Sequence, residues 1–393
     1  MKKYNKITPE GTRDFIFEEC THREALAFSL LTLFTGRGYS QVTTPGLEFF
    51  DVFHSMSPES MYKLTDAKGR LMVLRADTTM PMARVAATRL KNQLLPLRLC
   101  YKQTVYTVNQ EMSGRSNEVF QAGIELVGAP SKRADLEVLF LAIEGLSLCH
   151  ISDFKLELGH AGFFKALCCE IGLTEEERES IRILIERKNY AALKDYLDTL
   201  GKPEAMILNK LPRLFGGPEV LESALKLCKS EKSLQILAYV KELYNDLCQG
   251  GLQENIIIDM GLVHRNEYYT GVIFRGFMGG SGDTVLSGGR YDNLLQEFGD
   301  PMEATGFGIN IDSLAKCCFD DSVQKKVPDA LVFGQKGSET KALLYVQSLV
   351  KQGLVCESST AGNEEEAMAY AKQKGIQKLI VIDNQTEKEC VVQ

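Results

Sequence analysis

The chain has 393 residues, 44% of them hydrophobic and 25% charged, an ordinary composition for a soluble globular protein of two or three domains. No run of about 18 apolar residues occurs, and no apolar segment follows the two lysines near the N-terminus, so we expect a cytoplasmic protein without a membrane span or signal peptide. The net charge of −7 disfavours a protein whose main task is to bind nucleic acid, since such proteins usually present a basic face.

The cysteines and histidines do not have the spacing of disulfide partners or metal ligands. There are 11 cysteines, an odd number without a CxxC pair, and Cys168–Cys169 and Cys317–Cys318 are adjacent pairs in expected helices. This pattern is typical of reduced cysteines that fill apolar space. The five histidines also lack metal-ligand spacing. We therefore predict no disulfide, no metal and no other cofactor.

The N-terminal part predicts a helix, two strands and a second helix. Residues 21–35 carry apolar side chains at helical spacing. Residues 39–43 have the pattern of a short strand, and residues 71–77 that of a buried one. A helix should follow at once, with Thr78 or Thr79 able to cap its N-terminus.

The middle of the chain changes from strands to helices. Residues 97–108 and 119–128 predict two antiparallel strands joined by a polar loop, and residues 134–149 predict a long helix. From 163 to 249 the pattern is almost wholly helical, and Thr174 with Glu177 forms a capping-box signature. A helical block between β-rich segments indicates an inserted subdomain.

Strands return after this block, and a second, smaller unit follows. We expect residues 97–128 and 255–311 to form one mainly antiparallel sheet. The segment after Pro328 alternates strands and helices as βαβαβ, which is typical of a small α/β unit with parallel pairing. The predicted fold class is thus α/β (α+β), with the following domains: a core of residues 1–162 and 252–322, a helical insertion of residues 163–251, and a C-terminal α/β domain of residues 328–393.

Six motifs occur in the order found in histidyl-tRNA synthetases of class II. One of them, GLVHRNEYYTGVIF, resembles the histidine-binding signature of that family, which usually reads LVRGLDYYTGTVF. The six matching segments are residues 8–15, 38–48, 74–79, 114–128, 261–274 and 287–299. The resemblance implies a class II synthetase-like antiparallel sheet flanked by helices.

The same resemblance implies a pocket for histidine. In the family, one carboxylate receives the ammonium group of the substrate, a Gln and a Glu line the pocket, and two tyrosines hold the imidazole. The matching positions here are Asp77, Thr79, Gln121, Glu125, Tyr268 and Tyr269. The spacing of four residues keeps Gln121 and Glu125 on one face of a strand. A carboxylate and a phenol can read the two ring nitrogens, because each of these nitrogens can be made a donor.

The arginines that handle ATP in the family are absent. Adenylate formation places negative charge on a phosphate, which preorganised cations must stabilise, and arginine suits this task best. The second-motif arginine and glutamate are replaced by Thr107 and Asn109, the arginine of the histidine signature by His264, and that of the third motif by Ser313. Loss of one such contact costs roughly 10²- to 10³-fold in rate, so the loss of three predicts negligible adenylation.

A chain that retains the histidine-pocket residues but lacks these arginines resembles the regulatory subunit of ATP phosphoribosyltransferase. The resemblance implies a non-catalytic chain that activates a short-form catalytic subunit in the first step of histidine biosynthesis and binds histidine as a feedback signal. It also implies a homodimer formed near Pro45, within a hetero-oligomer. Histidine would act by shifting a conformational equilibrium through its differential affinity for two states.

The C-terminal segment resembles only the first part of an anticodon-binding domain. Residues 328–393 contain seven lysines, no arginine and nine acidic residues, a balance of −2. Anticodon binding favours positive charge and exposed aromatic side chains. We therefore expect a packing or docking module and no tRNA partner.

Two other functions remain open, an active histidine–tRNA ligase and a free-standing histidine sensor for another partner. The residues also have simpler interpretations. Asp77 could cap the following helix, Gln121 and Glu125 could belong to a solvated strand face, and one of Tyr268 and Tyr269 could lie on the surface. The glycines of residues 287–292 should serve a tight turn rather than a phosphate site. The acidic run 364–366 should open a helix, where the helix dipole favours negative charge.

Overall fold

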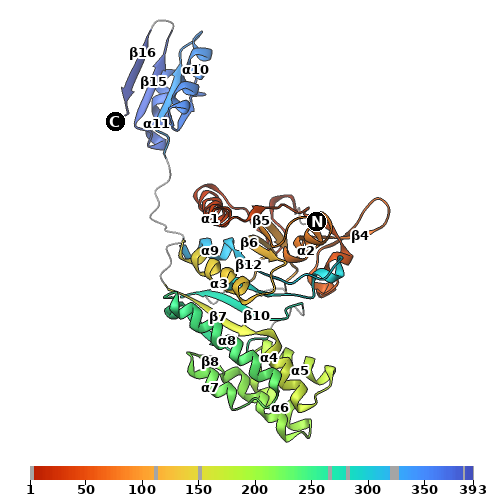
Figure 1. The fold of residues 1–393 in the computed structure, drawn as a ribbon. Coiled ribbons are helices and arrows are strands. Elements are labelled where there is room, and N and C mark those ends of the chain that lie inside the picture. Colours follow the sequence, from red (N-terminus) through yellow and green to blue (C-terminus); the bar gives the residue numbers. More distant parts are fainter. Residues whose placement is uncertain are drawn as a thin grey trace. The chain divides into compact units, whose positions relative to one another are not determined.

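The chain divides into two compact units, which are described separately. The computed structural model describes residues 4–109, 114–148, 153–263, 268–279, 284–318, 327–383 and 386–392. The first unit comprises Met1–Phe319 and the second Asp320–Gln393 (Figure 1).

A nine-stranded, mainly antiparallel sheet forms the centre of the first unit (Figure 1). In spatial order its strands are β1 (Ser40–Gln41), β5 (Leu97–Tyr106), β6 (Glu118–Val127), β12 (Ala304–Asn310), β11 (Thr284–Arg290), β10 (Val272–Met278), β7 (Phe154–His160), β9 (Ile256–Asp259) and β8 (Phe215–Gly216). Only the β1–β5 and β7–β9 pairs are parallel. The predicted union of residues 97–128 and 255–311 in one sheet is confirmed, although β7 and β8 were not predicted.

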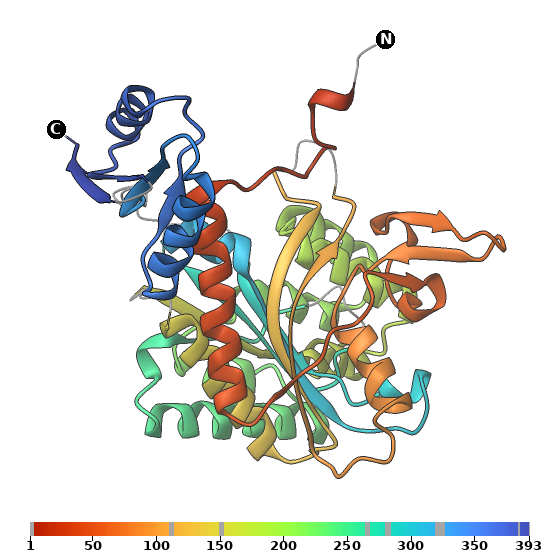
Figure 2. The same ribbon diagram turned by 90° about the horizontal axis from the view of Figure 1, so that it is seen from above.

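The two faces of this sheet bury different residues. Helices α1 (Phe17–Gly36), α3 (Lys132–Ser147) and α9 (Ile311–Cys318) cover one face, and Figure 2 shows α1 beside α9. Cys100 and Ile124 belong to this apolar core. Their neighbours Tyr101 and Glu125 point to the opposite face, because successive side chains of a strand alternate. The first face thus packs an apolar core, whereas the second carries polar side chains such as Glu125 beside a second apolar cluster that includes Leu97, Leu99 and Val127.

Residues 161–249 form a helical block that packs on the β7 side of the sheet. Its helices are α4 (Ala161–Ile171), α5 (Glu175–Glu186), α6 (Tyr190–Thr199), a 3-10 segment (Pro203–Arg213), α7 (Glu219–Leu225) and α8 (Glu231–Gln249). Helix α8 contacts both β7 and α3. The predicted capping box is confirmed: Thr174 N donates to Glu177 at 2.8 Å and Glu177 N donates to the Thr174 hydroxyl at 3.2 Å.

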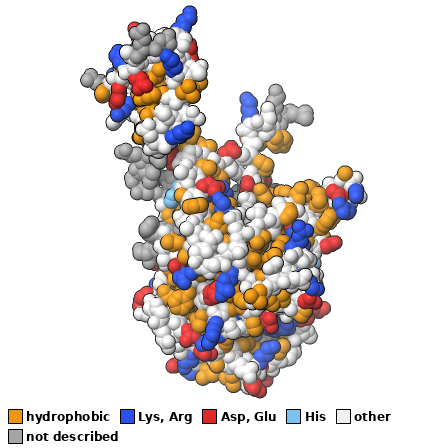
Figure 3. All heavy atoms as spheres, turned by 45° about the horizontal axis from the view of Figure 1, so that its top comes forward, with side chains coloured by type: hydrophobic (Ala, Val, Ile, Leu, Met, Phe, Trp, Pro, Cys, Tyr) orange, Lys and Arg blue, Asp and Glu red, His pale blue; other side chains and the backbone are white. Residues whose placement is uncertain are grey.

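A three-stranded ribbon projects from the first unit. It contains β2 (Leu47–Phe49), β4 (Leu71–Leu74) and β3 (Lys63–Thr65), in that order. The predicted buried strand over 71–77 is wrong in extent, since it ends at Leu74, and only partly right in burial: Val73 is buried, whereas Leu71, at the start of the strand, is exposed. Figure 3 shows hydrophobic side chains gathered at the base of the β3–β4 hairpin.

The glycines of residues 287–292 do not form the predicted tight turn. Gly288 and Gly289 lie within β11, in register with β10 and β12. A Cβ atom on Gly288 would lie 2.5 Å from the carbonyl oxygen of Gly306, and one on Gly289 would lie 2.6 Å from that of Val272. These glycines are therefore required for close strand packing.

The second unit has the predicted βαβαβ order and one additional strand. Its elements are β13 (Ala330–Gly334), α10 (Glu339–Lys351), β14 (Cys356–Ser358), α11 (Glu364–Lys374), β15 (Lys378–Ile382) and β16 (Glu387–Val391). Strand β13 pairs in parallel with β14 and β15, whereas β16 pairs antiparallel with β15. The acidic run 364–366 opens α11 as expected, with Asn363 as its N-cap.

Neither a membrane-spanning helix nor a metal-binding cluster occurs in the part of the chain that the structure describes. There, no helix is long and apolar enough to cross a bilayer. No three His, Cys, Asp or Glu side chains gather as metal ligands among the same residues. The described cysteines are all free thiols.

Gly288→Ala should destabilise the fold, because its new methyl group would meet backbone rather than a flexible side chain. We expect the free energy of unfolding to fall by roughly 1–3 kcal/mol, as for other overpacked sites. Gly36→Ala is the control, since no atom lies within 4 Å of its added Cβ. Urea denaturation measures both variants, and equal stability of Gly288→Ala and wild type would refute the packing argument.

Candidate functional site

Five of the six predicted pocket residues, together with two further tyrosines, form one cluster on the polar face of the large sheet. We call this set the pocket cluster: Asp77, Thr79, Tyr101, Glu125, Tyr268, Tyr269 and Tyr291. Asp77 and Thr79 come from the start of α2 (Thr79–Thr88), Tyr101 from β5 and Glu125 from β6. Segments far apart in the sequence therefore meet at this point.

The Glu125 carboxylate is the most deeply buried charged group of the pocket cluster. Its residue is 1% exposed, and the Tyr291 hydroxyl donates a hydrogen bond to Glu125 Oε2. Among the described residues, Oε1 has no hydrogen-bond partner of normal geometry. Burial raises the pKa of Glu125 to about 8, although interactions with Tyr291 and Thr79 offset part of the rise. An unsatisfied buried carboxylate oxygen can accept a hydrogen bond from a ligand.

The Glu125 side chain has room against the sheet because the residue opposite it on β12 is a glycine. Gly306 pairs with Glu125 across the strands. A Cβ atom on Gly306 would lie 1.9 Å from Glu125 Oε2. Any other residue at this position would displace the carboxylate.

Asp77 combines two of the interpretations considered from the sequence. Its Oδ1 accepts a hydrogen bond from Met80 N at 2.9 Å, so the carboxylate does cap α2. Thr78, expected as a possible cap, forms no side-chain capping bond. Burial raises the pKa of Asp77 to about 6, while the amides of Met80 and Thr79 act to lower it. Asp77 also acts electrostatically on Glu125 and on Tyr268, so its carboxylate faces the pocket cluster.

The tyrosines of the YYTG motif lie together rather than on opposite faces. The ring centroids of Tyr268 and Tyr269 are 4.7 Å apart, and Tyr268 meets Tyr291 edge-on at 5.9 Å. Alternation does not apply, because both residues precede β10 in an irregular segment. The interpretation that placed one of them on the surface is therefore wrong.

Gln121 lies four residues before Glu125, on the same face of β6. A Cβ atom on the neighbouring Gly308 would lie 2.9 Å from the Tyr101 hydroxyl and 3.7 Å from Gln121 Oε1. Gln121 therefore lies beside Tyr101, at the border of the pocket cluster. The solvated-face interpretation is wrong for Glu125, while Gln121 is partly buried.

Two members of the pocket cluster, Tyr101 and Tyr291, were not predicted. Tyr291 follows the glycines of SGGRYD, where only a turn was expected. Tyr101 lies opposite Gly123 in the β5–β6 register. A Cβ on Gly123 would lie 2.5 Å from the Tyr101 hydroxyl. A tyrosine facing a strand glycine was a usable signal, but only once the strand register was known.

Thr107, Asn109 and Ser313, the positions at which the sequence predicts the loss of ATP-handling residues, are neutral and take part in local hydrogen bonds. Thr107 N donates to Asn117 O at 2.8 Å, and the Asn109 amide donates to Ser116 O at 2.8 Å. Ser313 N donates to Asn310 Oδ1 at 3.0 Å within the start of α9. His264, the fourth such position, lies outside the described residues.

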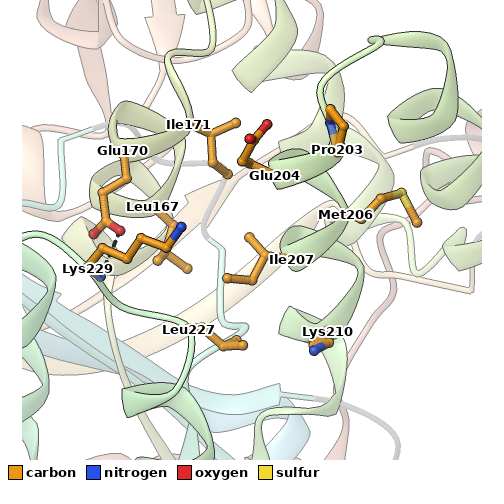
Figure 4. Close-up of a pocket in the computed structure, with 10 residues that line it drawn as sticks. All are labelled: Leu167, Glu170, Ile171, Pro203, Glu204, Met206, Ile207, Lys210, Leu227 and Lys229. Atoms are coloured by element: carbon orange, nitrogen blue, oxygen red, sulfur yellow. Dashed lines mark hydrogen bonds between the residues drawn. The ribbon is translucent and has the colours of Figure 1, made fainter.

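A separate cavity of about 290 Å³ lies within the helical block (Figure 4). Figure 4 shows apolar side chains such as Leu167 and Ile207 together with Lys210 and Lys229 around it. None of the residues predicted from the sequence lines this cavity. The pocket cluster remains the candidate site because it gathers carboxylates and phenols with perturbed pKa values.

The fold and the pocket cluster define a histidyl-tRNA synthetase-like protein. The family model described as histidyl-tRNA synthetase matches residues 11–314. The crystal structure of an ATP phosphoribosyltransferase regulatory subunit/histidyl-tRNA synthetase from Bacillus halodurans superimposes with a TM-score of 0.86 at 30% identity, covering 98% of this chain and 100% of that one. A histidyl-tRNA synthetase from a Nostoc species, at 19% identity and a TM-score of 0.78, shares the fold over 99% of this chain and 97% of its own.

Curated relatives identify members of this class to which the chain is similar in sequence. An ATP phosphoribosyltransferase regulatory subunit from Clostridium kluyveri is 39% identical over 96% of this chain and 99% of its own length. One from Bacillus cereus is 34% identical over 100% of this chain and 95% of its own. The chain belongs to the family of ATP phosphoribosyltransferase regulatory subunits.

Glu125 should make stability depend on pH. Its folded pKa of about 8 lies above the unfolded value, so the folded protein binds more protons in between. The free energy of unfolding therefore falls as pH rises from about 5 to 8. Glu125→Gln removes this titration. The free energy of unfolding of the variant, relative to that of wild type, should therefore rise by on the order of 2–4 kcal/mol between about pH 5 and about pH 8.

Urea denaturation at a series of pH values measures this difference. Glu176→Gln, on the exposed side of α5, is the control and should follow wild type. Parallel curves for Glu125→Gln and wild type would show that Glu125 does not titrate as described. Asp77 adds a smaller effect of the same sign at lower pH.

Proposed function

We propose that this chain is a non-catalytic subunit that activates a short-form ATP phosphoribosyltransferase catalytic subunit and senses histidine for feedback inhibition. Family membership supports the regulatory role. The unsatisfied Glu125 Oε1, buried among four tyrosines, supports histidine as the effector. The subunit would act in the cytoplasm, without tRNA.

The chemistry of the pocket cluster suits both ends of histidine. Glu125 Oε1 would accept a hydrogen bond from one imidazole nitrogen, and a phenol of the Tyr268–Tyr269 pair would meet the other. Asp77 would receive the ammonium group, while Thr79 and Gln121 border the same space. A cationic ligand would favour the charged form of both carboxylates, whose pKa values burial has raised.

We further propose that the chain has lost adenylation activity. Thr107, Asn109 and Ser313 are neutral and take part in local hydrogen bonds, so none of them can stabilise negative charge on a phosphate as arginine does. Histidine would then act as a ligand that is bound and released unchanged.

The base of the projecting ribbon is the proposed homodimer surface. Leu47, Phe49 and Leu71 are 45%, 43% and 42% exposed, although they are large and apolar. Between the first two, Glu48 is buried and accepts a hydrogen bond from Arg84 at 2.6 Å. The strand thus turns a charged residue inward and two apolar residues outward, as expected at a subunit interface.

Histidine should bind to the purified chain, and Glu125→Gln should weaken this binding. A hydrogen bond to a charged group contributes about 1.5–3 kcal/mol, so the dissociation constant should rise about 10- to 100-fold. Isothermal titration calorimetry measures both proteins. Glu118→Gln, on the same strand but outside the pocket cluster, is the control and should bind like wild type.

Three outcomes separate the alternatives. Adding the wild-type chain to a short-form catalytic subunit should raise its turnover, and histidine should lower it again. Histidine binding without any effect on that enzyme would favour a free-standing sensor. Histidine-dependent pyrophosphate exchange would favour an active ligase, and absence of histidine binding would refute the proposed effector site.

Phe49→Glu should dissociate the homodimer, because it places a charge in an apolar interface. Light scattering coupled to size-exclusion chromatography measures the mass in solution. Phe28→Glu is the matched control, since Phe28 is 66% exposed on α1, away from the ribbon. A dimer that survives Phe49→Glu but not Phe28→Glu would place the interface on α1 instead.

A further inference from the structure

Arg290 connects the pocket cluster to the helical block. It is the last residue of β11 and directly precedes Tyr291, whose hydroxyl donates to Glu125. The Arg290 side chain points to the opposite face of the sheet. There its Nε lies 2.9 Å from Asp135 Oδ1 of α3, and Nη2 lies 2.8 Å from the same oxygen.

This ion pair is buried and extends to α8. Asp135 is 0% exposed and Arg290 is 7% exposed. The Tyr239 hydroxyl of α8 donates a hydrogen bond to Asp135 Oδ2. Removing one partner of a buried pair leaves an uncompensated charge, so each member restricts the position of the others. Tyr239 therefore helps to fix the Arg290 guanidinium.

The main chain of Arg290 also holds the segment that carries the two pocket tyrosines. Thr270 N donates to the Arg290 carbonyl oxygen at 2.8 Å. A Cβ on Gly271 would lie 2.8 Å from Arg290 Cδ, so the side chain passes directly over the Gly271 backbone. A displacement of Arg290 would consequently move both Tyr291 and the Tyr268–Tyr269 segment.

A second contact joins the same segment to the helical block. Ala161 N, at the start of α4, donates to the Gly271 carbonyl oxygen at 2.9 Å. His160, the N-cap of α4, meets the Tyr239 ring edge-on with a centroid distance of 6.3 Å. The first residues of α4 and the middle of α8 thus contact the pocket segment from one side.

We propose that Asp135 and Tyr239 are positioning residues that couple occupancy of the pocket cluster to the packing of α8 against α3. They touch no ligand and act through Arg290. This inference rests on the proposed function, since histidine is the ligand whose binding would be coupled. The helical block would then be the element through which the effector changes the rest of the subunit.

Tyr239→Phe is the variant of choice, because it removes one hydroxyl and keeps the ring. Coupling residues of this kind alter binding by about 0.5–2 kcal/mol, which corresponds to a dissociation constant raised about 2- to 30-fold. Tyr244→Phe, on the same helix but outside this network, is the matched control and should bind histidine like wild type. Hydrogen exchange of α8 should slow on histidine binding in wild type and in Tyr244→Phe, but not in Tyr239→Phe.

A ligand-free measurement tests the same coupling independently. Urea denaturation of Tyr239→Phe, Tyr291→Phe and the double variant forms a mutant cycle, and coupled residues give a double effect that departs from the sum of the single effects. Additive effects, together with an unchanged α8 response to histidine in Tyr239→Phe, would overturn the inference. A wild-type chain that binds no histidine but shows non-additive effects would overturn the proposed function and leave the connection through Arg290 supported.

Discussion

The burial of the Glu125 carboxylate is the constraint on which this structure depends. A carboxyl group removed from water is costly to ionise, and burial accordingly raises the pKa of Glu125 to about 8. The Tyr291 hydroxyl donates to one of its oxygens, and the other has no hydrogen-bond partner of normal geometry among the described residues. The carboxylate can occupy this position only because Gly306 leaves the space open. Strands β6 and β12 must therefore hold one register, since a slip of one residue would turn Glu125 into the apolar core.

The large sheet separates two kinds of environment. On one side α1, α3, α9 and the helical block bury an apolar core that supplies stability. On the other side tyrosines from β5, from the segment before β10 and from the end of β11 surround two carboxylates. Arg290 reaches from the second environment into the first, where Asp135 compensates its charge. In a buried polar network of this kind every donor and acceptor needs a hydrogen-bond partner, because each unpaired group would destabilise the fold.

The family comparison illustrates how one fold carries different functions. The chain shares its architecture with a histidyl-tRNA synthetase at 19% identity, yet belongs to a family named for regulation. Under the proposed function the relevant differences are few: Thr107 and Ser313 are neutral where the resemblance places ATP-handling arginines, while the carboxylates and phenols of the pocket cluster remain. Function therefore follows from the side chains at the site and not from the fold.

The sequence by itself determined most of the order of the elements, the antiparallel sheet interrupted by helices, the capping box of α5 and the family. These features depend on local periodicity and on contiguous motifs, which a single chain displays directly. It also identified Asp77, Glu125, Tyr268 and Tyr269 as candidates by their positions in those motifs. Their proximity to one another is a separate fact.

Only the tertiary structure decided which residues complete the site and how deeply they are buried. Tyr101 and Tyr291 join the pocket cluster because strand register brings them opposite glycines and carboxylates far away in the sequence. Asp135 pairs with Arg290 and with Tyr239, each of which lies more than one hundred positions away in the sequence. The exposure of β4 and the extra strand β16 likewise depend on which neighbours cover a strand. Burial and long-range pairing are properties of the folded chain, so no local pattern encodes them separately.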